Sequence, residues 1–68
     1  MIEIKIATEI IKLDSFLKWC GAVSSGSEAK VYIQNGDVKL NDNVELQRGK
    51  KLKRGDIIQI KSQVYKII

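Results

Sequence analysis

The spacing of apolar residues changes twice along this 68-residue chain, and these changes constrain its fold more than any other feature. Over residues 1–6 apolar and charged residues alternate, a pattern typical of a half-buried β-strand with Ile2, Ile4 and Ile6 on one side. Over residues 13–33 the apolar residues recur at helical spacing, and after Gly36 the spacing returns to two. The chain is therefore expected to form a strand, a helical segment and then several short strands.

The first predicted helix has four side chains on one face: Leu13, Phe16, Leu17 and Cys20. Asp14 suits the positive end of its dipole, Gly21 can end it, and Thr8 or a neighbouring residue is a candidate cap. Cys20 is interpreted as a small core residue. The alternative, a reactive thiol, has only Lys18 nearby to lower its pKa.

The second predicted helix begins with a capping box. The Ser25 hydroxyl is expected to accept from the Glu28 N–H, and the Glu28 carboxylate to return to the N–H of Ser25. A narrow apolar stripe follows at Ala29, Tyr32 and Ile33. Asn35 and Gly36 then provide the left-handed residue that ends a helix.

The remaining strands are predicted at residues 38–40, 44–46, 57–61 and 64–68. Residues 41–43 and 55–56 are expected to form turns, and the polar stretch 47–55 a loop that Leu52 pins to the core. Because the helices and most strands form separate runs, the fold class is α+β, with two short adjacent helices and a small antiparallel sheet in a single domain, 1–68.

Composition excludes several classes of function. Without histidine and with one cysteine, the chain lacks the usual zinc ligand sets and the commonest general base, so no catalytic residue, metal or cofactor is expected. Glu28 with Asp37, or Asp14 with Glu45, remains only a remote possibility for a catalytic carboxylate pair. No signal peptide or long apolar run is present, so a cytoplasmic protein without a membrane partner is expected. The protein is also expected to act as a monomer and to have no small-molecule substrate.

Positive charge is concentrated near the C-terminus. Residues 1–47 carry 5 basic and 7 acidic side chains (net −2), whereas residues 48–68 carry 7 basic and 1 acidic (net +6), which sum to +4. Five of these cations are Arg48, Lys50, Lys51, Lys53 and Arg54. The run is either a solvated loop or an edge that binds a polyanion.

Several motifs together resemble the S-four RNA-binding domain first described in small-subunit ribosomal protein four. They are Lys12-Leu13-Asp14, Phe16-Leu17, Ser25 to Ala29, Ile33, Gly36, Val38, Leu40-Asn41 and Gly55-Asp56-Ile57-Ile58. The match spans about residues 12–60 and is most similar to standalone bacterial YaaA-type members. Gly26 stands where common members have Arg, and Asp42 where Gly usually follows Asn.

The resemblance implies the αL motif, a helix pair on a curved sheet that binds RNA, and a role in translation or ribosome-related processes. Taken with the charge pattern, it assigns RNA contacts to Lys12, Lys18, Ser25, Gly26, Ser27, Lys30, Lys39, Asn41, Arg48, Lys50, Lys51, Lys53 and Arg54. Gly26 and Ser27 offer N–H groups to a phosphate, and the basic loop is hypothesised to fold beside that helix start.

The sequence indicates the type of nucleic acid less directly than it indicates the binding of a polyanion. Few aromatic residues are available for base stacking, so phosphates, 2′-hydroxyls and the shape of structured RNA, ribosomal or transfer RNA for example, are the expected determinants. Trp19 lies off the apolar face and either covers the core edge or touches a ribose or a partner. A DNA target remains open from charge alone. The principal rival function is a protein-interaction module in which residues 64–68 form an exposed sheet edge.

Overall fold

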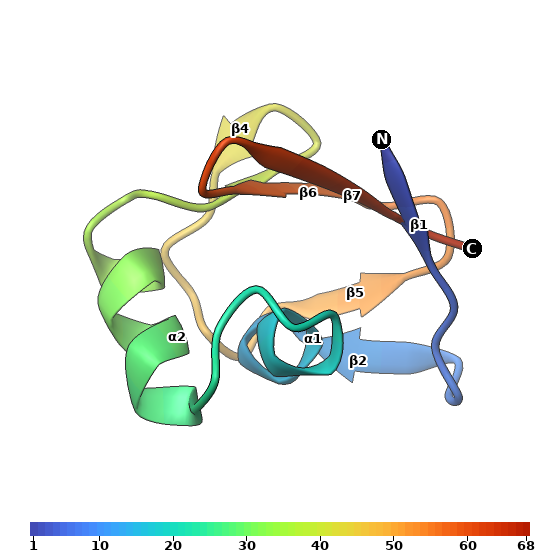
Figure 1. The fold of residues 1–68 in the computed structure, drawn as a ribbon, viewed down its shortest axis with the longest axis horizontal. Helices are drawn as coiled ribbons and strands as arrows, with labels where there is room; N and C mark the ends of the chain where they lie inside the picture. The colour runs from blue at the N-terminus through green and yellow to red at the C-terminus, as the bar shows by residue number, and fades with distance from the viewer.

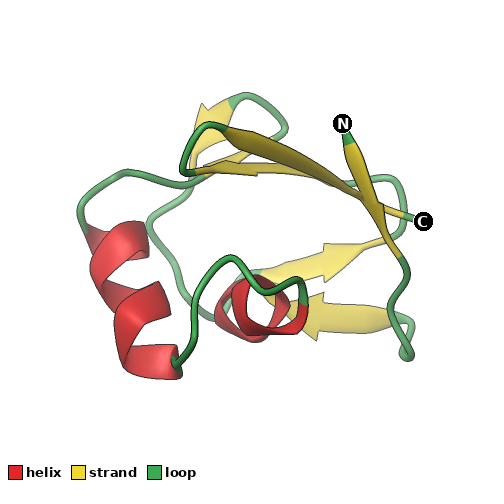
Figure 2. Ribbon diagram, viewed as in Figure 1, coloured by secondary structure: helices red, strands yellow, loops and turns green.

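Two layers of strands enclose the core in the computed structural model, which describes residues 1–68 (Figures 1 and 2). The elements are β1 (Ile2–Ile4), β2 (Ile10–Lys12), α1 (Leu13–Trp19), α2 (Gly26–Gln34), β3 (Lys39–Leu40), β4 (Asn43–Val44), β5 (Lys51–Lys53), β6 (Ile57–Ile60) and β7 (Gln63–Ile67). A five-stranded sheet forms one layer, and α1 with the β2–β5 pair forms the other. The α+β prediction, with two adjacent helices packed on a small sheet, is confirmed.

The five-stranded sheet has the order β1-β7-β6-β3-β4. Its pairs are antiparallel except for β1 and β7, which run parallel with Ile2 opposite Tyr65, so the sheet is mixed at that edge. β1 is an edge strand that ends at Ile4: Ile2 is exposed, whereas Ile6, beyond the strand, is buried. The half-buried strand predicted over residues 1–6, with the three isoleucines on one side, is therefore shorter than expected and is exposed at Ile2.

The C-terminal strand lies inside the sheet. β7 is hydrogen-bonded to β1 on one side and to β6 on the other, and the Ile68 N–H donates to the Ile4 carbonyl at 2.9 Å. Residues 64–68 therefore close the sheet and do not offer a free edge for strand addition.

The β2–β5 pair was not predicted. Ile10 to Lys12 and Lys51 to Lys53 form an antiparallel two-stranded sheet, so part of the expected loop 47–55 is a strand. Thr8 is not the cap of α1: its hydroxyl donates to the Ile10 carbonyl at 2.6 Å, and the N-cap residue, Lys12, makes no side-chain cap bond.

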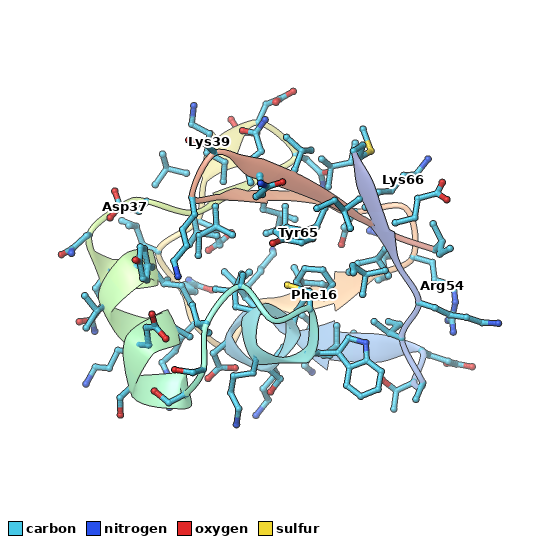
Figure 3. The ribbon with its side chains drawn as sticks, in the orientation of Figure 1. Phe16, Asp37, Lys39, Arg54, Tyr65 and Lys66 are labelled. Carbon is cyan, nitrogen blue, oxygen red and sulfur yellow. The ribbon has the colours of Figure 1, made fainter.

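The core lies between the two layers. Phe16 of α1 and Tyr65 of β7 meet edge to face with ring centroids 6.3 Å apart, and Figure 3 shows them pointing toward one another. Leu52 is fully buried, as predicted for the side chain that pins the basic segment. Cys20 is half-buried, its thiol donates to the Leu17 carbonyl at 3.6 Å, and burial raises its pKa, all of which fits a core residue.

The second helix begins and ends at the predicted residues. The Glu28 N–H donates to the Ser25 hydroxyl at 3.1 Å, and the C-cap residue Asn35 precedes Gly36 at φ +79°. The return half of the capping box differs from the prediction, because the Glu28 carboxylate accepts from the N–H (2.7 Å) and hydroxyl (3.0 Å) of Ser24.

The predicted strand 44–46 is shorter than expected. β4 ends at Val44: one further hydrogen bond, from the Glu45 N–H to the Val38 carbonyl opposite it, follows, and the chain then leaves the sheet toward the β2–β5 pair. Both Val44 and Leu46 are exposed. No helix is long and apolar enough to cross a lipid bilayer.

Candidate nucleic-acid interface

One face of the β2–β5 pair is basic and open to solvent. Strand alternation turns Ile11 and Leu52 toward the core and leaves the other face to exposed side chains. We call this the basic face, formed by Ile10, Lys12, Lys51 and Lys53. The register sets Lys12 directly opposite Lys51 and Ile10 opposite Lys53. The pairing of segments about forty residues apart therefore places three lysines together.

The charge of the basic face is largely uncompensated. The structure contains three ion pairs, and neither Lys12 nor Lys51 belongs to one. Lys53 lies 3.7 Å from Asp56, but its side chain is 77% exposed, so this pair is weak. Like charges directly opposite one another destabilise a strand pair. A bound anion would remove this repulsion, which makes the basic face suited to a polyanion.

The basic segment that precedes β5, from Arg48 to Lys50, covers the start of α1. Because Lys12 provides no side-chain cap, the first N–H groups of the helix need other acceptors. The Leu13 N–H donates to the Lys50 carbonyl at 2.8 Å, and the Asp14 N–H to the Arg48 carbonyl at 3.0 Å. Arg48 also pairs with the Asp14 carboxylate at 3.3 Å. The backbone of this segment is thus fixed on α1, while the side chain of Lys50 is exposed.

The hypothesis from the sequence placed the basic loop beside the start of α2, whereas these contacts attach it to the start of α1. The backbone hydrogen bonds of the loop go to α1 instead, because α1 is the helix without a side-chain cap. At the start of α2 the Ser25 hydroxyl already accepts a hydrogen bond from the Glu28 N–H. The Glu28 carboxylate lies 3.5 Å from the Lys61 ammonium. The N–H and hydroxyl of Ser24, and then Lys61, lower the pKa of Glu28.

The positive end of α2 therefore already has an anionic side chain. Gly26 is partly exposed, whereas Ser27 and Lys30 are exposed and have no side-chain hydrogen bond or ion pair. These residues remain accessible, but a phosphate there would meet the charge of Glu28. The start of α2 is a weaker anion site than the basic face.

Two predicted contacts lie elsewhere. Figure 3 shows Lys39 projecting from the outer side of the five-stranded sheet, away from α1 and the β2–β5 pair. Asn41 serves the turn between β3 and β4: its amide donates to an Asp56 carboxylate oxygen at 3.2 Å, and its oxygen accepts from the Ile57 N–H at 2.9 Å. Neither residue joins the basic face.

Arg54 directly follows Lys53 of the basic face and lies on the side of the β1–β2 connection. The Arg54 guanidinium donates to the Ile6 carbonyl at 3.3 Å, and Figure 3 shows Arg54 beside the segment that leads from β1 toward β2. Lys18 is exposed in the last turn of α1. The predicted contact at Arg54 can therefore accompany an RNA that lies on the basic face.

Two further exposed apolar residues are relevant: Ile10, which was not assigned a contact from the sequence, and Trp19, for which contact with a ribose or a partner was one of two alternatives. Ile10 lies on the basic face with 51% of its surface exposed. Trp19 is 56% exposed, and its indole N–H donates to the Lys5 carbonyl at 2.8 Å. The place of Trp19 off the apolar stripe of α1 was the available signal, whereas Ile10 is recognisable only once the β2–β5 pairing is known.

The turn between β3 and β4 explains one departure from the family pattern. Asn41 and Asp42 have φ of 50° and 72°, a conformation that glycine adopts at lower cost. Asp42, which occupies the position where the family usually has Gly, thus tolerates a left-handed backbone. The departure concerns the turn and leaves the basic face unchanged.

Comparison with known proteins agrees with this geometry. The S4 domain family model matches residues 4–68. A probable ribosome maturation protein, RlbA of Bacillus subtilis, is 40% identical over 57 residues, which cover 84% of this chain and 80% of that protein. The crystal structure of 30S ribosomal protein S4e from Thermoplasma acidophilum superposes with a TM-score of 0.65 at 19% identity, over 87% of this chain and 31% of that one. The last likeness shows the fold alone. The family match over nearly the whole chain and the extent of identity show that this chain belongs to the S4 domain family.

Proposed function

We propose that this protein binds structured RNA through its phosphates and shape, in a ribosome-related process. The observation that carries the proposal is the exposed, unpaired juxtaposition of Lys12 and Lys51 on the basic face, with Lys53 on the same face and Lys50 adjoining it. Membership of the S4 domain family and similarity to a probable ribosome maturation protein support RNA as the polyanion.

The chemistry of the face favours backbone recognition. Lysine ammonium groups are point charges with rotatable donors, which suit phosphates and carry little base specificity. A-form RNA presents 2′-hydroxyls and phosphates across a shallow minor groove, so a rigid, two-stranded basic surface can recognise its shape. The role is one of binding, with no catalytic step.

A pair of matched double variants tests the proposal. Lys12→Gln/Lys51→Gln removes two charges from the basic face, and Lys39→Gln/Lys66→Gln removes two from the outer side of the five-stranded sheet, where Figure 3 shows both lysines. Affinity for a hairpin RNA is measured by fluorescence anisotropy as a function of salt. The basic-face variant should lose about two units of the log–log salt slope, because each phosphate contact contributes about one.

The control variant should keep the wild-type slope, since its lysines lie on the opposite layer. Equal losses in the two variants would show that net charge alone drives binding and would overturn the assignment of the interface. A salt-independent wild-type affinity would overturn RNA binding itself. Replacing the hairpin with duplex DNA of the same sequence separates RNA from DNA, and weaker DNA binding is expected because B-DNA lacks the 2′-hydroxyls and the A-form shape.

Protein recruitment by strand addition has less support. Its expected edge, residues 64–68, is paired on both sides within the sheet. No other observation favours it over RNA.

A further inference from the structure

The one exposed aromatic ring of the molecule lies next to a surface hollow that is not part of the basic face. Phe16 and Tyr65 are buried, and Tyr32 is half-buried with the Lys61 ammonium 4.9 Å from its ring centroid. Trp19 alone exposes more than half of its surface. Together with Lys5, Ile6 and Ala7 it lines a shallow hollow of about 330 Å³ on the surface. A flat aromatic wall, an apolar floor and a lysine thus meet in one place.

The indole is held in a fixed orientation. Its N–H donates to the Lys5 carbonyl at 2.8 Å, so one edge of the ring is tied to the chain segment that forms the hollow. A tryptophan that only covered the core edge would be expected to bury most of its rings. An oriented, half-exposed ring has the properties of a stacking surface, which loses little side-chain freedom when a ligand binds.

The hollow adjoins the basic face. Arg54 donates to the Ile6 carbonyl at 3.3 Å, so Arg54 and Trp19 are bound to consecutive carbonyls of the same segment. From Ala7 the chain reaches Ile10, the first residue of the basic face, in three residues, which is at most about 11 Å. Along α1, Trp19 lies about 9 Å beyond Leu13, whose N–H binds the basic segment. Both separations are short enough for one RNA to contact the hollow and the basic face together.

The charges around the hollow suit a nucleotide. Lys5 lines it and Lys18 immediately precedes Trp19, and neither lysine belongs to an ion pair. No acidic side chain is among the lining residues. A base stacked on the indole would therefore have cations available for its flanking phosphates.

We propose that Trp19 and the hollow formed by Lys5, Ile6 and Ala7 bind an unpaired nucleobase by stacking, next to a duplex region held on the basic face. The inference rests on the proposed RNA-binding function and deepens it: the preferred substrate is a structured RNA with an unstacked nucleotide beside a helix. Stacking on an aromatic side chain is tolerant of base identity, so the site selects an unpaired base over a paired one and does not select its sequence.

The test uses two RNAs with the same number of phosphates. One is a duplex with a single bulged adenosine, and the other carries an abasic nucleotide at the bulge. Wild-type protein should prefer the adenosine bulge by about tenfold, within the range measured for one stacked base. Because the chain has a single tryptophan, its emission reports on the site directly and should be quenched by the adenosine bulge and little changed by the abasic one.

Trp19→Ala should bind the two RNAs equally, with the salt slope of the wild type, since no charge is removed. Trp19→Phe keeps an aromatic ring without the indole N–H and should retain part of the preference. Thermal melts monitored by circular dichroism verify that the variants fold, and the quenching experiment needs no variant.

The outcomes separate the two proposals. If wild-type protein binds neither RNA in a salt-dependent manner, the proposed function fails. If it binds both RNAs equally with unchanged emission, or if Trp19→Ala keeps the preference, RNA binding stands and the stacking site is overturned. Under that second outcome the exposed indole would serve structure or a protein partner.

Discussion

Replacing Asn41 by alanine distinguishes a structural role for this residue from the RNA contact expected by family resemblance. Its side chain joins the β3–β4 turn to the start of β6, by donating to the Asp56 carboxylate at 3.2 Å and accepting from the Ile57 N–H at 2.9 Å. Asp56 is only 7% exposed, so its carboxylate depends on protein donors, the Lys53 N–H at 2.9 Å being another. Asn41 also holds a φ of 50°.

The expected loss of stability follows from these three features. The hydrogen bond to a buried carboxylate contributes about 1.5 kcal/mol, and the solvent-accessible bond to Ile57 about 0.5 kcal/mol. Forcing alanine into the left-handed region costs about a further 1 kcal/mol. The total, about 3 kcal/mol, is a large part of the roughly 3 to 10 kcal/mol expected for a domain of this size.

Thermal and urea unfolding, followed by circular dichroism, measure this effect. Asn41→Ala should lower the thermal midpoint by about 12 to 24 °C. Asn41→Gly loses the same two hydrogen bonds but adopts a positive φ readily, so it should lose about 2 kcal/mol. The difference between the two variants isolates the backbone strain.

RNA affinity, measured for the glycine variant below its unfolding transition, should equal that of the wild type. An unchanged midpoint together with weaker RNA binding would refute the structural role and return Asn41 to the interface. Equal midpoints for the alanine and glycine variants would refute the strain at this turn.

Three further changes test the contacts that hold the fold. Because the folded-state pKa of Glu28 is lowered, its stabilising effect is complete above its usual pKa of 4.5 and disappears as the pH falls through the folded value. The midpoint difference between wild type and Glu28→Gln should therefore shrink in acid, and a constant difference would contradict the charge-based contact. Lys61→Met should cost about 2 kcal/mol in urea unfolding, since Lys61 donates to the Ala22 carbonyl at 2.7 Å, pairs with Glu28 and covers Tyr32. Lys66 makes no such contacts, so an equal loss of stability in Lys66→Met would argue against a stabilising role for the contacts of Lys61. Ser62→Gly should raise the midpoint by about 4 to 8 °C, because Ser62 holds a φ of 63°, and a lower midpoint would show that the turn is unstrained.

Local patterns were sufficient for the helices. The apolar stripe of α1 and the Ser25–Glu28 cap of α2 depend on residues within one or two helical turns, and both were predicted at the observed positions. The β2–β5 pair was missed because its strands have three residues each and pair across about forty residues of chain. Nothing in the local pattern of Ile10 to Lys12 specifies a partner so far away. The parallel pairing of β1 with β7 was missed for the same reason.

The sequence indicated which basic residues to consider for the candidate site, but it did not indicate which of them share a surface. Lys12, Lys50 and Lys51 are close together because of the β2–β5 register, which the sequence does not reveal. Lys39 shares their charge but alternates to the outer side of the other sheet. Asn41 also matches the family pattern, but its side chain bonds to Asp56 and to the Ile57 N–H and so contributes to the fold.

The same structural requirement that stabilises α1 also positions the basic segment. A lysine at the N-cap leaves the first N–H groups of the helix without a side-chain acceptor, and the carbonyls of Arg48 and Lys50 supply the missing bonds. This arrangement brings the segment against α1 and, one residue after Lys50, sets Lys51 opposite Lys12 at an electrostatic cost. A serine or aspartate at position 12 would cap the helix and remove the repulsion, but it would also remove one of the two lysines that face each other. A lysine at this position is therefore unfavourable for stability, which is consistent with the anion-binding role proposed for the basic face.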